Sequence, residues 1–188
     1  KNEKSYWDNV LLDYDSSKSS YLTSNKEKIE YYNLDITKEK TQELLRNSSK
    51  AYNTQINDIL LTALGYALFE FTNNKVSYVT LEGHGREEID ESIDITRTVG
   101  WFTTMYPVRL EAKGDLSASL KFTKDMLRKI PNKGIGYGVL IGYKDNLLPK
   151  ISFNYLGQFD NEDRVEDNRS EEHTSELQSQ FRISYAVF

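Results

Sequence analysis

Apolar residues recur at helical spacing in four stretches of the chain. The longest stretch, residues 56–71, predicts a helix with Thr54 or Asn57 as its N-cap. The residues expected to form its buried face are Ile56, Leu60, Ala63, Leu64, Ala67, Leu68 and Phe71. Shorter helices are expected at residues 6–12, 38–50 and 115–130. Thr37 precedes the second of these helices as an N-cap, and Pro131 stops the last one.

Four other stretches have the composition of β-strands, rich in β-branched and aromatic residues. They are residues 29–36, 76–81, 106–112 and 151–156. Pro107 has no backbone N–H, so the third strand should start at a sheet edge or a bend. Because strands and helices alternate along the chain, the sequence predicts an α/β domain built as an α+β two-layer sandwich.

Composition narrows the class of protein. The chain has 188 residues, 38% hydrophobic and 28% charged, which is enough for one domain with its own core. The net charge is −5 with acids and lysines interleaved, so a general nucleic-acid surface is not expected. No apolar run approaches the roughly 18 residues of a membrane span, and no membrane partner is predicted. The chain has no cysteine and no secretory signal, and we expect it in the cytoplasm.

One loop combines chemically active side chains. The sequence EGHGRE, residues 82–87, follows a predicted strand and brings together Glu82, His84 and Arg86 between two glycines. This pattern fits a site of acid/base chemistry, and it fits a tight turn with solvated charges equally well. No metal-ligand spacing such as HxH or HExxH is present, so no metal site is predicted. The glycines of residues 134–138 do not have a nucleotide-binding spacing.

Five motifs in order carry a family resemblance. They are DILLTALG at 58–65, EGHGRE at 82–87, RTVGWFTTMYP at 97–107, PNKGIGYG at 131–138 and FNYLGQ at 153–158. Together they resemble the epimerization domains of nonribosomal peptide synthetases, within the condensation-domain superfamily. The resemblance implies a chloramphenicol acetyltransferase-like fold of two halves flanking a central channel, of which this chain supplies the C-terminal half.

The resemblance also implies an activity and a set of site residues. Such a domain inverts the α-carbon of an aminoacyl or peptidyl thioester by acid/base proton transfer, which needs a base, an acid and a donor to the enolate oxygen. Glu82 matches the family's acid/base glutamate, while the histidine of the family's HHxxxDG motif has no counterpart here. Asn154 and Tyr155 match positions that orient the thioester or the enolate oxygen. Arg86 is expected to hold Glu82, a substrate carboxylate or a developing oxyanion, and a structural ion pair within the loop is the alternative.

Three further residues are expected to lie along the substrate channel. They are Trp101, Thr103 and His84. A buried aromatic anchor is an alternative role for Trp101. His84 is also expected to be a turn histidine with a backbone partner.

The expected partners follow from the same resemblance. They are a peptidyl carrier domain, the missing N-terminal half and the neighbouring synthetase modules; no cofactor is bound directly, since the substrate rides on the carrier's phosphopantetheine arm. Two other interpretations stay open: a condensation domain that forms peptide bonds, and a non-catalytic carrier-docking half-domain. Residues 1–168 are expected to be the partial domain. Residues 169–188, beginning RSEEHTSELQS, resemble a translated sequencing adapter and are left out of site reasoning.

Overall fold

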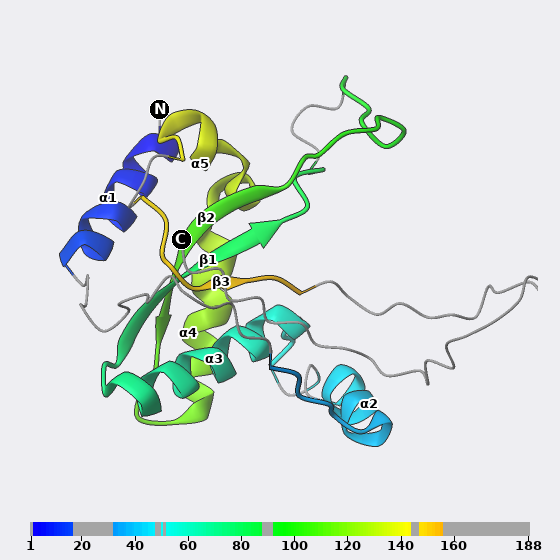
Figure 1. Cartoon of the computed structure of the whole chain (residues 1–188), viewed down its shortest axis with the longest axis vertical. Helices are drawn as coiled ribbons and strands as arrows, with labels where there is room; N and C mark the ends of the chain where they lie inside the picture. The colour runs from blue at the N-terminus through cyan, green and yellow to red at the C-terminus, as the bar shows by residue number, and fades with distance from the viewer. Residues whose placement is uncertain are drawn as a thin grey trace, which may run out of the picture.

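The protein is organised around a three-stranded mixed sheet. The computed structural model describes residues 2–16, 32–47, 50, 52–87, 92–143 and 147–155. The strands are β1 (Val76–Gly83), β2 (Thr104–Glu111) and β3 (Ser152–Phe153), in the order β2-β1-β3. β1 runs antiparallel to β2 and parallel to β3, so β1 lies in the centre of the described sheet (Figure 1).

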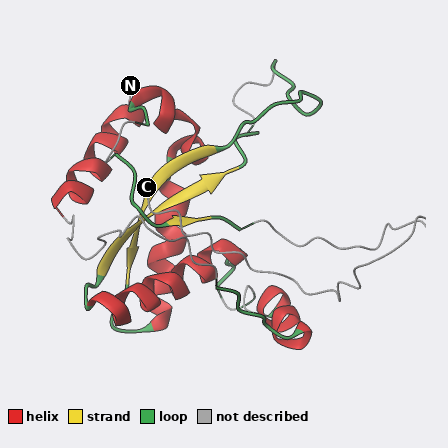
Figure 2. Ribbon diagram, in the orientation of Figure 1, coloured by secondary structure: helices red, strands yellow, loops and turns green. Residues whose placement is uncertain are grey.

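Two long helices pack on one face of this sheet, which confirms the predicted α+β layering (Figure 2). α3 (Ile56–Thr72) contacts β1, β2 and α4 (Leu116–Lys129). The core beneath them is apolar, and its central members are Leu61, Leu64, Val79, Val108, Leu110 and Phe153. α3 lies close to β2 at Gly65, where a Cβ would lie 3.4 Å from the Cβ of Leu110.

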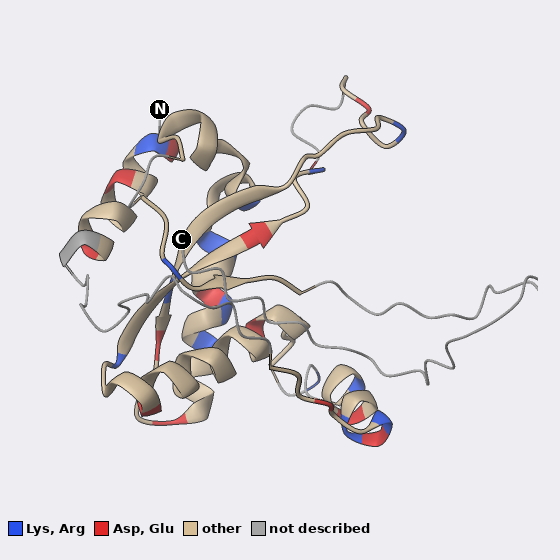
Figure 3. Ribbon diagram, in the orientation of Figure 1, with Lys and Arg blue, Asp and Glu red and all other residues tan. Residues whose placement is uncertain are grey.

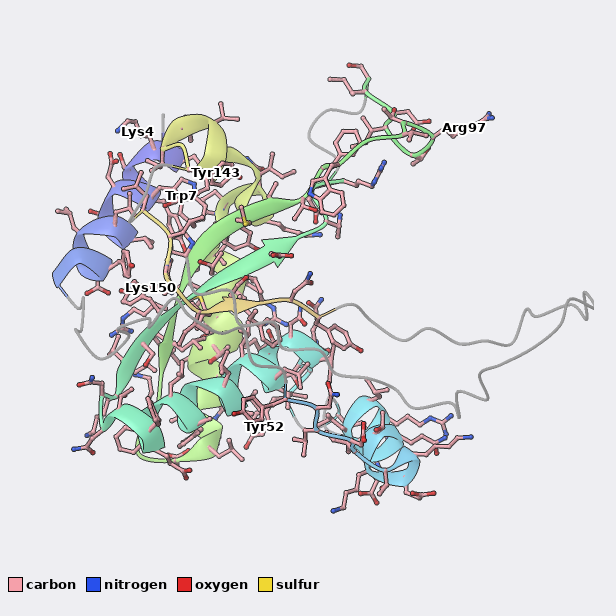
Figure 4. The ribbon with its side chains drawn as sticks, in the orientation of Figure 1. Lys4, Trp7, Tyr52, Arg97, Tyr143 and Lys150 are labelled. Atoms are coloured by element: carbon pink, nitrogen blue, oxygen red, sulfur yellow. The ribbon has the colours of Figure 1, made fainter. Side chains whose placement is uncertain are left out.

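A second group of helices closes one end of the core around aromatic rings. α1 (Asn2–Ser16) packs against α5 (Ile135–Leu140), which follows the short 3₁₀ helix η1 (Pro131–Gly134). Trp7 of α1 is fully buried (Figure 4). Its ring packs edge-on against the ring of Tyr137, with 5.0 Å between the ring centroids. The contact anchors α1, which contains the predicted helix at residues 6–12, against the rest of the fold.

The four predicted helices are present, but their bounds and the N-cap of the longest one differ from the prediction. Thr37 does cap α2 (Lys38–Arg46), a helix that carries charges of both signs (Figure 3). Asp115 caps α4 by accepting a hydrogen bond from the Ala118 N–H at 2.7 Å. The N-cap of α3 is Gln55, in a capping box with Asp58, so the predicted caps Thr54 and Asn57 are wrong.

The predicted buried face of α3 is also partly wrong. Ala63 and Ala67 are exposed and Phe71 is 79% exposed, while Leu61 and Gly65 are buried in their place. The apolar residues surround more of the helix than one face can bury, so periodicity alone did not select the stripe that packs.

The strand predictions are confirmed for 76–81 and 106–112 and corrected elsewhere. The last strand is short, with only residues 152–153 paired. Residues 32–36 form no strand, and Tyr32 and Leu34 are about four-fifths exposed, because no described strand lies beside them to pair with their backbone. The end of the predicted last strand and the whole of 169–188 lie outside the described residues. No described helix has the length and apolar character needed to cross a bilayer.

Candidate functional site

Sheet pairing brings together two of the predicted site residues. β1 and β3 pair Thr80 with Ser152 and Leu81 with Phe153, so the next residues along each strand are neighbours. These are Glu82 and Asn154, and the Nδ2 of Asn154 donates a hydrogen bond to Oε2 of Glu82 at 2.7 Å. Both side chains are half-buried at the end of the central strand. The site is therefore a carboxylate fixed by a neutral amide donor, and such a group can both take up and release a proton.

Tyr155 lies next to this pair along the chain. It is half-buried and packs against the hydrophobic core. Burial raises the pKa of the Tyr155 phenol, and its hydroxyl is protonated at neutral pH, as that of a tyrosine with an ordinary pKa also is. The structure thus places a protonated hydroxyl one residue from Asn154, the residue that contacts the carboxylate of Glu82.

Arg86 organises the loop after β1 rather than the carboxylate. Its guanidinium donates to the carbonyl oxygens of Ile95 at 3.0 Å and Gly100 at 3.4 Å, and it stacks on the Phe102 ring at 4.4 Å. Gly85 makes this packing feasible: its φ is +65°, and a Cβ there would lie 1.6 Å from the Phe102 carbonyl oxygen. The guanidinium thus binds backbone carbonyls and an aromatic ring of the following segment, which is neither a contact with Glu82 nor the expected ion pair within the loop.

His84 and Glu87 form a connected set with a lysine from η1. The backbone N–H of Arg86 donates to Nδ1 of His84 at 3.0 Å, which gives His84 the expected backbone partner. Nε2 of His84 lies 3.0 Å from one carboxylate oxygen of Glu87, and Lys133 Nζ lies 2.6 Å from the other. Glu87 is mostly buried while His84 and Lys133 are exposed, so the carboxylate is the centre of the set.

Trp101 and Thr103 belong to the projecting segment between the loop and β2. Trp101 is 92% exposed, so a buried aromatic anchor is the wrong interpretation within the described part of the chain. Val99 is also almost fully exposed, and Arg97 lies far out in the same segment (Figure 4). Thr103 is half-buried where this segment joins β2.

Sequence reasoning missed Glu87 and Lys133 as partners. They lie 46 residues apart, and a pairing over that distance leaves no local pattern. The one signal is the turn chemistry of residues 131–134, where a proline, an asparagine and a glycine surround Lys133. Within the described ranges no three His, Asp or Glu side chains form a group able to hold a metal ion.

Comparison with known proteins gives a family and several relatives. The model of the condensation-domain family matches residues 1–187. Gramicidin S synthase 1 from Brevibacillus brevis is 48% identical over 179 residues, covering 87% of this chain and 16% of that protein. Bacitracin synthase 3 from Bacillus licheniformis is 53% identical over 133 residues, covering 66% of this chain and 2% of that protein. The chain therefore spans a small part of the length of these relatives.

Two solved structures share the fold. The epimerization domain from the third module of tyrocidine synthetase B is 34% identical, with a TM-score of 0.70, and covers 97% of this chain and 44% of that one. The first condensation domain of the calcium-dependent antibiotic synthetase is 14% identical, with a TM-score of 0.55, and covers 84% of this chain and 36% of that one. Because the family model matches nearly every residue, the chain belongs to the condensation-domain family of nonribosomal peptide synthetases and represents part of such a domain.

Proposed function

We propose that the chain is the C-terminal part of an epimerization domain in which Glu82 exchanges the α-proton of an aminoacyl or peptidyl thioester. The observation that carries the proposal is the hydrogen bond from Asn154 to Glu82, which fixes a half-buried carboxylate beside a neutral donor. The similarity to the tyrocidine synthetase epimerization domain supports it, since that structure is 34% identical to this chain. The condensation domain of the calcium-dependent antibiotic synthetase is less similar to this chain, with 14% identical residues.

The chemistry follows from the position of the carboxylate. The carboxylate of Glu82 takes the proton from the α-carbon, and the electron pair of that C–H bond moves into the thioester carbonyl to give an enolate. A second acid on the opposite face returns a proton to the α-carbon, which inverts its configuration. In the reverse direction Glu82, now protonated, acts as the acid. The family's HHxxxDG histidine is the expected second group, and it lies in the half of the domain that this chain does not contain.

The neighbouring polar groups stabilise the enolate. In the proposal the phenol of Tyr155, which is protonated at neutral pH, donates to the enolate oxygen. Asn154 holds Glu82 in one orientation, so that the carboxylate meets the substrate without first reorganising.

The partners follow from the substrate. The thioester is carried on the phosphopantetheine arm of a peptidyl carrier domain, and this chain binds no cofactor of its own in the proposal. Val99 and Trp101 are nearly fully exposed apolar side chains on a projecting segment, where we expect the N-terminal half of the same domain to cover them. Neighbouring synthetase modules deliver and receive the carrier.

The test is α-proton exchange in a complete domain that contains this segment. A carrier loaded with an L-aminoacyl group is incubated in deuterium oxide, and deuterium uptake and D-isomer formation are measured. We expect Glu82→Gln to lower both rates by about 10²- to 10⁴-fold, the range of general acid/base catalysis. The matched control is Glu70→Gln, on the exposed side of α3, which leaves both rates unchanged. Full exchange by Glu82→Gln overturns the proposal, and exchange by residues 1–168 alone contradicts the need for a second half.

A second candidate is condensation, favoured by the name of the matching family model. A condensation domain joins two carrier-bound substrates through a peptide bond. Supplying both a donor and an acceptor carrier distinguishes the two activities, because condensation gives a longer peptide whose α-carbon keeps its configuration. A domain that binds the carrier and catalyses neither reaction is a docking module.

A further inference from the structure

We propose that Glu87 is the positioning residue of this site: it fixes the ring of His84 and ties the loop after β1 to η1 through Lys133. The inference rests on the proposed function, since the group being positioned is the carboxylate of Glu82. It gives roles to Glu87 and Lys133, which the proton-transfer scheme above does not use.

The first step is the tautomer of His84. Nδ1 accepts the backbone N–H of Arg86, so this nitrogen carries a lone pair and no hydrogen. The ring hydrogen of neutral His84 is then on Nε2, where it points to Oε1 of Glu87 at 3.0 Å. Both nitrogens are occupied, so neutral His84 has no lone pair left to accept a substrate proton. His84 therefore acts as part of the loop framework.

The second step is that one carboxylate serves two partners. Oε1 of Glu87 accepts a hydrogen bond from Nε2 of His84 at 3.0 Å, and Oε2 pairs with Nζ of Lys133 at 2.6 Å. The side chain of Glu87 is 19% exposed, against 66% for His84 and 73% for Lys133. The two exposed side chains thus converge on a mostly buried carboxylate.

The third step is the conformation of the turn that presents Lys133. Asn132, Lys133 and Gly134 have φ angles of 43°, 48° and 86°, three left-handed residues in succession. Such a conformation is unfavourable for residues other than glycine, so the surrounding fold must hold it in place. Gly134 packs closely against Tyr106 of β2, and only glycine fits there because a Cβ would lie 2.1 Å from the ring.

The fourth step connects this turn to Glu82. The carbonyl oxygen of Lys133 lies 3.8 Å from the position of a Cβ on Gly83, the residue directly after Glu82. Lys133 therefore contacts the loop twice: its backbone borders Gly83, and its ammonium holds Glu87. These two contacts fix the direction in which the chain leaves β1, and with it the backbone that carries the carboxylate of Glu82.

The energetics separate this role from a stabilising one. The contacts of Glu87 with the exposed His84 and Lys133 are a hydrogen bond and a surface ion pair, which contribute little to stability, so losing them should change the melting temperature little. A displacement of about 1 Å in a reacting group can cost on the order of 100-fold in rate. The expected signature is a fall in kcat with KM and the melting temperature nearly unchanged.

The experiment uses a complete domain and three variants. Glu87→Gln replaces one of the two carboxylate oxygens by an NH₂ donor and removes the charge, so His84 and Lys133 no longer each have an acceptor at their present positions. Lys133→Gly keeps the left-handed backbone and removes the ammonium, whereas Lys133→Arg keeps the charge. We expect Glu87→Gln and Lys133→Gly to lower kcat for α-proton exchange by about 10- to 100-fold, with Lys133→Arg close to the parent. Nitrogen-15 NMR of His84 should show the Nε2–H tautomer in the parent and a mixture in Glu87→Gln.

The outcomes distinguish failure of the positioning role from failure of the proposed function. If Glu82→Gln abolishes exchange and Glu87→Gln keeps full kcat, the positioning role is wrong and the proposed function stands. If Glu82→Gln exchanges normally, the proposed function is wrong. A fall in kcat that is matched by a large fall in melting temperature assigns Glu87 to folding alone and overturns the positioning role.

Discussion

Two carboxylates on one face of the sheet are held in opposite ways. β1 pairs Val76 with Glu111 at one end and Glu82 with Met105 at the other. The even spacing along the strand puts both glutamates on the same face, about 20 Å apart. Glu111 contacts the guanidinium of Arg109 and the ammonium of Lys113, whereas Glu82 contacts the amide of Asn154. Among the described residues no lysine or arginine forms an ion pair with Glu82.

The cationic end of the sheet is a structural network. The hydrogen bond from Lys113, followed by the contacts of Arg109, lowers the pKa of Glu111. Arg109 also reaches Asp13 of α1 at 3.1 Å, and Tyr78 donates a hydrogen bond to the same carboxylate. Burial and this carboxylate raise the pKa of Tyr78, so its hydroxyl remains a donor. These contacts join α1 to both long strands.

In the proposed function, this difference separates a structural carboxylate from one that exchanges protons. Cations hold Glu111 in its charged form, which suits a structural partner and prevents proton exchange near neutral pH. An amide donates to a carboxylate through its NH₂ group and accepts from a carboxylic acid through its oxygen, so Asn154 can serve both protonation states of Glu82. Substitutions at either end of the sheet test this contrast, from the largest expected effect to the smallest.

The first prediction gives Glu82 a cationic partner, like the partners of Glu111. Asn154→Lys places an ammonium beside Glu82, holds the carboxylate charged and should lower α-proton exchange by about 100-fold or more. The measurement is deuterium uptake on a carrier-bound substrate in a complete domain. Asn154→Gln is the matched control, because it keeps the amide and should retain more activity. Equal activity in Asn154→Lys and the parent would show that the neutral partner is irrelevant.

The second prediction compares two glycines near opposite ends of β2. Gly85→Ala forces a Cβ against the carbonyl oxygen of Phe102 at a left-handed position, so the backbone must move. We expect a loss of about 2 kcal/mol or more in unfolding free energy, measured by denaturant titration. Gly114→Ala is the control: nothing lies within 4 Å of its Cβ, and its stability should stay within about 0.5 kcal/mol of the parent or rise slightly. Equal stabilities would mean that the Gly85 loop relaxes freely.

The sequence indicated candidate site residues within single strands and loops, but it did not indicate the contacts between two strands. Glu82, Asn154 and Tyr155 were expected from motifs that resemble those of epimerization domains, since the pattern of residues 82–87 alone fitted a site and a solvated turn equally well. The bond between Glu82 and Asn154 depends on the parallel register of β1 and β3, which neither strand encodes alone. The strand expected at 29–36 failed in its described part for the same reason, since strand propensity supplies no partner.

The Arg86 loop shows the same limit at the level of side chains. The sequence identified a guanidinium near a carboxylate, but a guanidinium also binds backbone carbonyls, and the segment at 95–100 offered two of them. The exposure of Trp101 could not be predicted either, because a tryptophan in a motif is typical of a core anchor until the surrounding surface is known. Pairing and exposure are properties of the assembled fold.

The last prediction concerns the network end and should give the smallest effect. Glu111→Gln removes a charge that Arg109 and Lys113 share, and it should lower stability by no more than about 1 kcal/mol at neutral pH, with α-proton exchange unchanged. Since the pKa of Glu111 is lowered in the folded state, its stabilising effect is present above the unfolded pKa of about 4.3. It is lost as the pH falls through the lower folded value, where the parent also carries a neutral carboxyl group. Parent and variant should therefore differ in denaturation midpoint at pH 7 and converge in strong acid. A difference that grows with acidity would mean that Glu111 is stabilised in its protonated form, and the contrast between the two carboxylates would then be wrong.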